Sequence, residues 1–114
     1  MLHCGWRPLA AGIIERALDL LGDHPFQAAV GPSIGVGRYE VGPEVPRAIG
    51  PDGLNHYANG RLDLQGVIAE KLDRAAPDHV EFVRDCTYDR GDLYFSHRRD
   101  AGRTGRQAGV VWRI

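Results

Sequence analysis

The sequence predicts an α/β protein of the α+β kind, with helices flanking a mixed sheet. Two segments carry apolar residues at helical spacing, and short runs of β-branched and aromatic residues lie between and after them. The order of these segments lacks the regular strand–helix–strand repeat of a doubly wound sheet. The 114 residues form at most one domain, and they can bury only a modest core.

The first predicted helix spans residues 9–21. Apolar side chains recur every fourth residue along one face, at Leu9, Ile13, Ala17 and Leu21. Pro8 suits the first turn of this helix, and Gly22 suits its end. Gly12 costs the helix about 1 kcal/mol relative to alanine, so we expect it to mark a close packing contact.

A strand is predicted over Phe26–Val30, and a glycine-rich loop follows at residues 31–37. The loop invites a phosphate-binding interpretation, but it lacks the Gly-Lys-Ser/Thr of a Walker loop, so a tight strand-to-helix connection is favoured. Residues 39–49 are expected to form one or two helical turns interrupted by prolines. Residues 50–53 have the composition of a turn.

The second half of the chain predicts one long helix and two strands. The helix runs from Leu62 to Ala76, with an apolar face, and Pro77 ends it. His79–Val83 alternates as a half-buried strand does, and Val110–Ile114 is predicted to be a terminal strand.

Composition excludes several classes of protein. The net charge of -1 does not direct the chain towards nucleic acid or an anionic membrane. No apolar run approaches the ~20 residues that span a bilayer, and the first residues do not resemble a secretory signal. Two cysteines do not make a disulfide framework, so we expect a cytoplasmic protein with reduced thiols.

His3 and Cys4 are an adjacent pair of possible metal ligands. Neighbouring side chains on an extended segment point to opposite faces, so only one of the two is a good candidate. Imidazole and thiolate suit zinc or copper, and a catalytic zinc needs about three protein ligands. No ligand-type spacing links this pair to other histidines or to Cys86, and the spacing alone favours a buried thiol beside an ordinary histidine.

Two later segments carry further candidates. Cys86 follows the predicted strand and could act as a nucleophile if a histidine lies near it, although a small buried hydrophobe is the more ordinary interpretation. The segment 96–106 is rich in arginine and hydroxyl side chains, which bind phosphate well. Nearby aspartates dilute its charge, which argues against a nucleic-acid surface and leaves a solvated loop with internal Arg–Asp pairs as the alternative.

Six short motifs occur in a fixed order that resembles the laccase-domain family, also called multicopper polyphenol oxidase and peptidoglycan editing factor. They are His3-Cys4-Gly5-Trp6-Arg7, Gly31-Pro32-Ser33-Ile34-Gly35 with Tyr39-Glu40-Val41, Leu62-Asp63-Leu64, Cys86-Thr87, Phe95-Ser96-His97-Arg98-Arg99-Asp100 and Thr104-Gly105-Arg106. The resemblance covers essentially the whole chain. It implies half of a laccase-domain fold and a zinc-dependent enzyme that phosphorolyses adenosine, inosine or methylthioadenosine and deaminates adenosine. The older family label implies copper and phenol oxidation instead.

The resemblance also implies how a metal is held. In the family, a histidine and a cysteine from the first half join the histidine of a His-Ala-Gly-Trp-Arg-Gly motif, which corresponds to His3. Cys4 and Pro8 depart from that motif, and the other two ligands have no counterpart here. Residues 1–114 are therefore expected to be a single partial domain, the C-terminal portion of a family unit.

The partners implied are a purine nucleoside and phosphate, together with a first half of the fold or a second copy of the chain. Arg7, Arg98 and Arg106 are the weaker candidates for binding the substrate or phosphate. The alternatives to an enzyme are a non-catalytic fragment that needs a partner half and, under the older label, a copper-dependent phenol oxidase.

Overall fold

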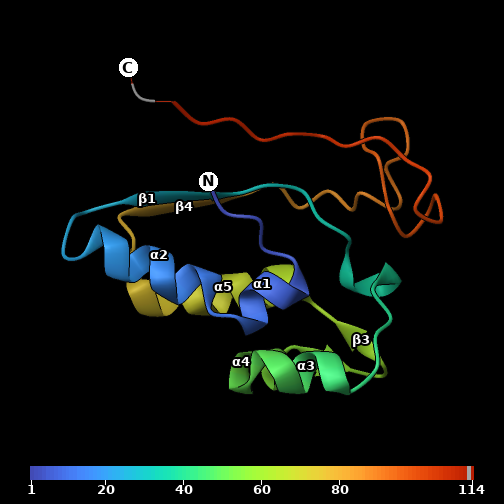
Figure 1. Cartoon of the computed structure of the whole chain (residues 1–114), viewed down its shortest axis with the longest axis horizontal. Helices are drawn as coiled ribbons and strands as arrows, with labels where there is room; N and C mark the ends of the chain where they lie inside the picture. The colour runs from blue at the N-terminus through green and yellow to red at the C-terminus, as the bar shows by residue number, and fades with distance from the viewer. Residues whose placement is uncertain (113) are drawn as a thin grey trace.

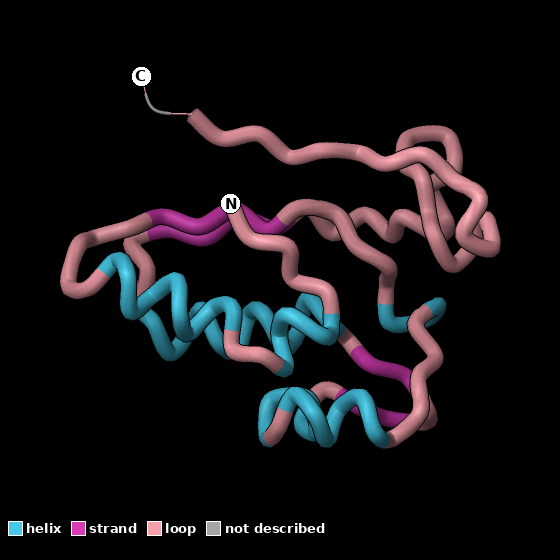
Figure 2. The backbone as a smooth tube through the Cα atoms, viewed as in Figure 1, coloured by secondary structure: helices cyan, strands magenta, loops and turns pink. Residues whose placement is uncertain are grey.

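The computed structural model describes residues 1–112 and 114. Its elements, in chain order, are α1 (Trp6–Ala10), α2 (Ile13–Leu21), β1 (Gln27–Val30), the 3-10 turn η1 (Val36–Arg38), α3 (Glu44–Ile49), α4 (Pro51–Asn55), β2 (Tyr57–Ala58), β3 (Arg61–Leu62), α5 (Leu64–Ala75) and β4 (His79–Phe82). After β4 the described chain runs mainly through turns and loops (Figure 2). None of the described helices is both long and apolar enough to cross a membrane.

Two small sheets make the fold a mixed one, as predicted. Strands β1 and β4 pair in parallel, with Gln27 opposite His79, and an isolated bridge between Ser33 and Cys86 continues the pairing. Strands β2 and β3 form an antiparallel hairpin. The segment Asn59-Gly60 turns this hairpin with φ values of 51° and 75°, which is the backbone that a two-residue hairpin loop requires.

Helices cover one side of the parallel sheet. Figure 1 shows α2 and α5 beneath β1 and β4, with α3 and α4 in a further layer. The apolar face of α5 forms the centre of the core, where Val67 is fully buried beside the fully buried Leu62. The buried hydrophobic residues are Leu9, Ile14, Tyr39, Val45, Ile49, Leu62, Leu64, Val67, Ile68 and Leu72.

The predicted helix over residues 9–21 is wrong as a single element, because the helix is interrupted between α1 and α2. Gly12 adopts φ 75°, in the left-handed region, and stands immediately before α2. A Cβ added there would meet only the carboxylate of Glu15, at 3.7 Å. Gly12 therefore turns the backbone and does not mark a close packing contact, although the apolar spacing continues across the break.

The expected helical turns within residues 39–49 form α3, where Pro46 lies inside the helix and is fully buried. The turn predicted at residues 50–53 is wrong, since Pro51 begins α4. Gly50 redirects the chain with φ 96°, and Pro51 then occupies a first-turn position that proline favours. Gly53 is buried against α3, so this second short helix is held by packing.

The predicted terminal strand at 110–114 is also wrong for the residues that can be described. Residues 110–112 have no strand partner and are exposed, and Arg113 lies outside the described residues. The N-terminal segment lies against this tail, because a Cβ on Gly109 would meet the sulfur of Met1 at 2.9 Å. Apolar alternation makes a strand only where a neighbouring strand offers hydrogen bonds, and the described chain offers none here.

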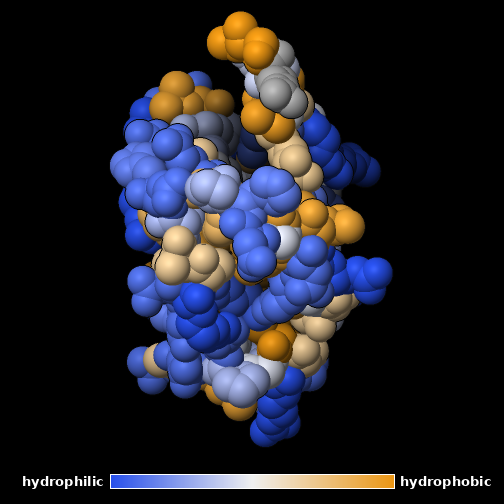
Figure 3. All heavy atoms as spheres, turned by 90° about the vertical axis from the view of Figure 1, so that its left-hand side faces the viewer, coloured by the Kyte–Doolittle hydropathy of each residue, from blue (hydrophilic) through white to orange (hydrophobic). Residues whose placement is uncertain are grey.

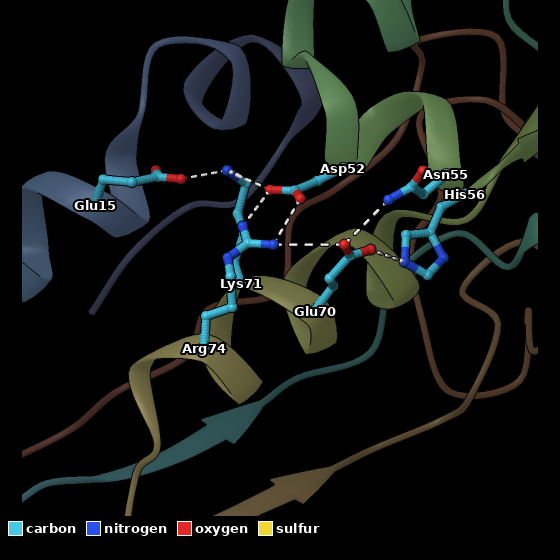
Figure 4. A network of polar contacts seen from close by, with 7 residues as sticks. All are labelled: Glu15, Asp52, Asn55, His56, Glu70, Lys71 and Arg74. Atoms are coloured by element: carbon cyan, nitrogen blue, oxygen red, sulfur yellow. Dashed lines mark hydrogen bonds and ion pairs between the residues drawn. The ribbon is translucent and has the colours of Figure 1, made fainter.

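A polar network joins α2, α4 and α5 (Figure 4). Asp52 accepts two hydrogen bonds from Arg74, at 2.8 Å and 2.6 Å, and lies 3.1 Å from the ammonium of Lys71. Lys71, with only 7% of its side chain exposed, also pairs with Glu15. Three helices are thus tied by a buried pair, Asp52 and Lys71, and by the more exposed Glu15 and Arg74.

This network should make the free energy of unfolding depend on pH in the acid range. Hydrogen bonds, first from Arg74, lower the pKa of Asp52 from 3.8 to about 2. A carboxyl whose folded pKa is depressed stabilises the fold fully above its unfolded pKa, and that stabilisation is lost as the pH falls through the folded pKa. We expect the free energy of unfolding to fall between pH 4 and pH 2, as measured by urea unfolding across that range. An Asp52→Asn variant should lose part of this pH dependence. If the pH dependence of that variant between pH 4 and pH 2 equals that of the parent chain, the assignment to Asp52 is contradicted.

The molecule is flat and exposes much surface. Its principal extents are 41 × 34 × 19 Å, and its accessible surface is 7827 Å². A folded monomer of this mass exposes about 6,200 Å², so roughly a quarter more is exposed here. Apolar side chains contribute to this surface, above all in the tail, where Val110, Val111 and Trp112 are exposed. Figure 3 shows hydrophobic atoms at the upper end of the molecule.

Candidate functional site

The N-terminal segment places His3 at the entrance to α1. The His3 side chain is exposed and folds back over Gly5, where a Cβ would lie 3.0 Å from its Nε2 atom. Cys4 is half-buried, and burial raises the pKa of its thiol. The two neighbours therefore differ: the imidazole is open to solvent, while the thiol is held in its protonated form. Of this pair, His3 is the better placed to bind a metal.

Two of the predicted anion-binding arginines lie over aromatic rings. Arg7 lies in α1 with its guanidinium 4.5 Å from the ring centre of Trp6. Arg98, in the loop after β4, donates a hydrogen bond to the carbonyl of Glu40 at 2.9 Å and lies 5.4 Å from the ring centre of Tyr39. Burial raises the pKa of Tyr39, and the charges of Arg98 and Arg7 both oppose that rise.

Neither Arg7 nor Arg98 has a carboxylate partner within residues 1–112 and 114. The carboxylate of Glu40 is instead bonded to Arg61 at 3.0 Å. Several arginines form ion pairs, namely Arg38 with Asp89, Arg74 with Asp52, Arg90 with Asp92 and Arg99 with Asp100. Others have no such pair among the described residues, namely Arg16, Arg47, Arg84, Arg103 and Arg106. A guanidinium group without a carboxylate partner can bind an anion.

The guanidinium of Arg106 donates hydrogen bonds to the carbonyls of Thr104 and Gly105, at 3.2 Å and 2.9 Å. Its predicted role in binding substrate or phosphate stays a prediction.

The neighbouring Arg99 orders the loop that carries Arg98. Its guanidinium donates to the carbonyl of Thr87 at 3.0 Å and pairs with Asp100 at 2.8 Å. Hydrogen bonds from Arg99 and then Thr104 lower the pKa of Asp100 to about 2. The interpretation of this segment as a loop with internal Arg–Asp pairs therefore fits Arg99, while Arg98 is left available for a ligand.

The glycine-rich loop packs against Cys86. The Cys86 sulfur accepts a hydrogen bond from the Gly35 amide at 3.2 Å, and a Cβ on Gly35 would lie 3.2 Å from the Cβ of Cys86. Gly35 is thus required by close packing, which fits a strand-to-helix connection better than a phosphate cradle. No histidine is hydrogen-bonded to Cys86 among the described residues, and its reactivity stays a prediction.

The described side chains do not by themselves make a catalytic zinc site. Nowhere in residues 1–112 and 114 do three histidine, cysteine, aspartate or glutamate side chains come together as ligands for a metal ion. A catalytic zinc needs about three such ligands. His3 can supply one of them.

Tyr39 was not identified as a site residue by the spacing of charged or metal-ligating residues. It stands in the segment Tyr39-Glu40-Val41, where an aromatic beside apolar residues is more often part of a core. Its ring is indeed in the core, with 8% of the residue exposed. Only the fold shows that Arg98 lies over this ring.

Comparisons with known proteins agree with the motif order. The family model for multi-copper polyphenol oxidoreductase laccase matches residues 1–114. A protein of Escherichia coli named purine nucleoside phosphorylase YfiH is 32% identical over 121 residues, covering 98% of this chain and 49% of that protein. A purine nucleoside phosphorylase of Deinococcus radiodurans is 35% identical over 119 residues, covering 96% of this chain and 46% of that protein.

The fold has a similar relative among solved structures. The crystal structure of Neisseria meningitidis protein NMB0706, of family DUF152, superposes with a TM-score of 0.74 at 28% identity, covering 86% of this chain and 45% of that one. The chain spans about half the length of the curated relatives it matches. Because the family model matches over the whole sequence, the chain belongs to the multi-copper polyphenol oxidoreductase laccase family.

Proposed function

We propose that this chain is part of a purine nucleoside phosphorylase that acts on adenosine, inosine or methylthioadenosine, with adenosine deamination as a second activity. The names of its relatives support the nucleoside substrate. The observation that carries the proposal is that Arg98, which lies over the ring of Tyr39, and Arg7, which lies over the ring of Trp6, have no carboxylate partners in the described structure. Phosphorolysis needs a phosphate dianion held beside C1′ of the ribose, and paired guanidinium groups hold such an anion electrostatically.

We further propose that His3 is one ligand of a zinc ion, with copper as the alternative that the family name suggests. Bound zinc would activate a water for deamination. The remaining ligands would come from outside the described residues, because His3 has no ligand partners among them. His3 lies shortly before the start of α1 and Arg7 lies in its first turn, so the proposed metal ligand and the proposed anion-binding arginine are at the same end of this helix.

The third part of the proposal is that residues 1–114 are a partial domain whose open surface is covered by a partner half or by a second copy of the chain. The exposed area exceeds that of a compact monomer by about 1,600 Å², given the 7827 Å² of this structure. A standard protein interface removes only about 800 Å² per partner. The chain thus has ample surface for a partner. We place the protein in the cytoplasm, where its two free thiols stay reduced.

Metal content after dialysis tests the role of His3. We expect a His3→Ala variant to bind zinc at least about tenfold more weakly than the parent chain, since losing even a supporting contact to a metal ligand costs that much. His24→Ala is the matched control, because the His24 ring is bonded to the carbonyl of Leu21. Elemental analysis and zinc titration of each chain combined with the partner half provide the measurement, with copper recorded alongside. Equal zinc binding by both variants would remove His3 from the metal site.

Turnover tests the proposed reaction separately. Protein loaded with zinc and given inosine and phosphate should release hypoxanthine and ribose-1-phosphate, and the release should stop when phosphate is omitted. If neither product forms in the presence of the partner half, the phosphorylase proposal fails. Release of product without phosphate would point to hydrolysis and would also contradict it.

A further inference from the structure

An open groove of about 530 Å³ lies beside strand β4. Its lining comes from β4 and the residue Arg84 just after it, from α5 and from His56. Strand β1 contributes none of the described residues that line it, so the groove lies on the side of β4 away from β1. Within the described residues β4 pairs only with β1, which leaves the backbone groups of its other edge available to a further strand.

The walls of this groove are apolar side chains that the chain itself leaves partly uncovered. Val80 and Phe82 of β4 are half-buried, and they face Ala69 and Leu72 of α5 across the groove. The guanidinium of the exposed Arg84 lies 4.1 Å from the ring centre of Phe82. A two-stranded sheet is marginal by itself, and a further strand would place its own side chains where this groove lies.

The same chain carries a segment that is suited to this place. Val110, Val111 and Trp112 have no strand partner, and the Trp112 side chain is 75% exposed. β-Branched and aromatic residues favour strands, and alternate residues of a strand share one face, which here joins Val110 to Trp112. Figure 1 shows this tail on the opposite side of the sheet from α2 and α5. The tail therefore lies away from the groove of its own chain, which α5 lines.

We propose that two copies of this chain form a symmetric dimer, in which the tail of each copy, residues 110–112, adds as a strand to the free edge of β4 in the other. Val110 and Trp112 enter the groove, and the indole packs against Phe82 and the guanidinium of Arg84. Each copy holds both the strand and the edge, so the contact is made twice and closes on itself. This inference rests on the proposed partial domain and assigns a second copy as its partner.

The exposed area is sufficient for such a dimer. The accessible surface of 7827 Å² exceeds that of a compact monomer by about 1,600 Å², while a standard interface removes about 800 Å² from each partner. Trp112 is the natural anchor of the contact, because tryptophan is enriched among the few residues that carry most of the binding energy of an interface.

Sedimentation equilibrium of the purified chain over a range of concentrations tests the dimer. We expect the parent chain to dimerise and Trp112→Gln to raise the dissociation constant about thirtyfold, the loss typical of an anchor residue. Trp112 is exposed in the single chain, so this variant keeps the monomer fold. Leu20→Gln is the matched control, because Leu20 is an apolar residue of α2 that is 90% exposed and lies outside the groove. It should dimerise as the parent chain does.

A mixture of two variants tests whether the tail binds the groove. Ala69→Arg fills the groove and should also weaken the dimer, but that variant keeps an intact tail, while Trp112→Gln keeps an intact groove. Mixed in equal amounts, the two should form a heterodimer with one of the two contacts restored, and it should be tighter than either variant alone. Native mass spectrometry distinguishes the heterodimer by its mass. A mixture that associates no better than its components would overturn the pairing.

The remaining outcomes separate this inference from the proposed function. A parent chain that stays monomeric at every concentration would overturn the dimer, and binding of a partner half by that monomer would leave the proposed partial domain intact. An unchanged dissociation constant in Trp112→Gln would overturn the role of the tail. Dimerisation that depends on Trp112, in a protein that releases no hypoxanthine, would support this inference and reject the phosphorylase.

Discussion

Replacing Asp52 with leucine is expected to destabilise the protein by about 3 kcal/mol, because the change leaves a buried ammonium group short of a partner. Asp52 has 10% of its side chain exposed, and Lys71 has 7%. Removing one member of a buried pair costs far more than the pair contributes, since the remaining charge cannot regain its hydration. Set against the ~5–15 kcal/mol that stabilises an ordinary domain, this loss is large. The midpoint and slope of urea unfolding provide the measurement.

The double variant Asp52→Leu with Lys71→Met is the matched control for that loss. It removes both buried charges and replaces them with apolar side chains of similar size, so we expect most of the stability to return. Asp89→Ala removes the partner of Arg38 in an exposed pair and should change the unfolding midpoint little. If the double variant is as unstable as the single one, the loss comes from packing and not from an unpaired charge.

Replacing Gly53 with alanine should destabilise the fold by about 3 kcal/mol, the upper part of the range for overpacking a core. A Cβ at Gly53 would lie 2.5 Å from the carbonyl oxygen of Pro46 and 2.8 Å from the Cβ of Ile49. Both of these atoms belong to α3, and one is backbone, so the helices α3 and α4 must separate. Helix propensity alone predicts the opposite sign, since alanine is favoured over glycine in a helix by about 1 kcal/mol.

Gly37→Ala is the glycine control for this prediction. No atom lies within 4 Å of a Cβ built at Gly37, and its φ is not in the left-handed region. We expect its thermal unfolding midpoint to match that of the parent chain, while Gly53→Ala unfolds at a clearly lower temperature. Similar midpoints for the two variants would mean that α3 and α4 can separate at little cost.

The spacing of apolar residues predicts correctly those helices and strands whose buried face belongs to one uninterrupted element. The predicted helix over Leu62–Ala76 appears as α5, and the strands predicted at Phe26–Val30 and His79–Val83 appear as β1 and β4. The predicted helix over residues 9–21 is divided at Gly12. The spacing of apolar residues cannot reveal this division, because the same face stays buried on both sides of it. The hairpin at Asn59-Gly60 was missed, although that dipeptide is a strong turn signal.

The candidate site was predictable only in part, because its members are brought together by tertiary structure. Arg7 and Arg98 stand out as cations in the sequence, but nothing local distinguishes Arg98 from Arg99, which the fold uses to order a loop. Tyr39 looks like a core residue, and its ring is one. Only the folded chain brings Arg98 over that ring, and spacing along the sequence cannot reveal this contact.

The parallel pairing of β1 with β4 also has a consequence for the time course of folding. Gln27 pairs with His79 across about fifty intervening residues, and closing a chain segment of that length costs about 3.5 kcal/mol of entropy. The hairpin and α5 involve near neighbours and can form early. We therefore expect the amides of β1 and β4 to gain protection from hydrogen exchange late in refolding, after those of α5.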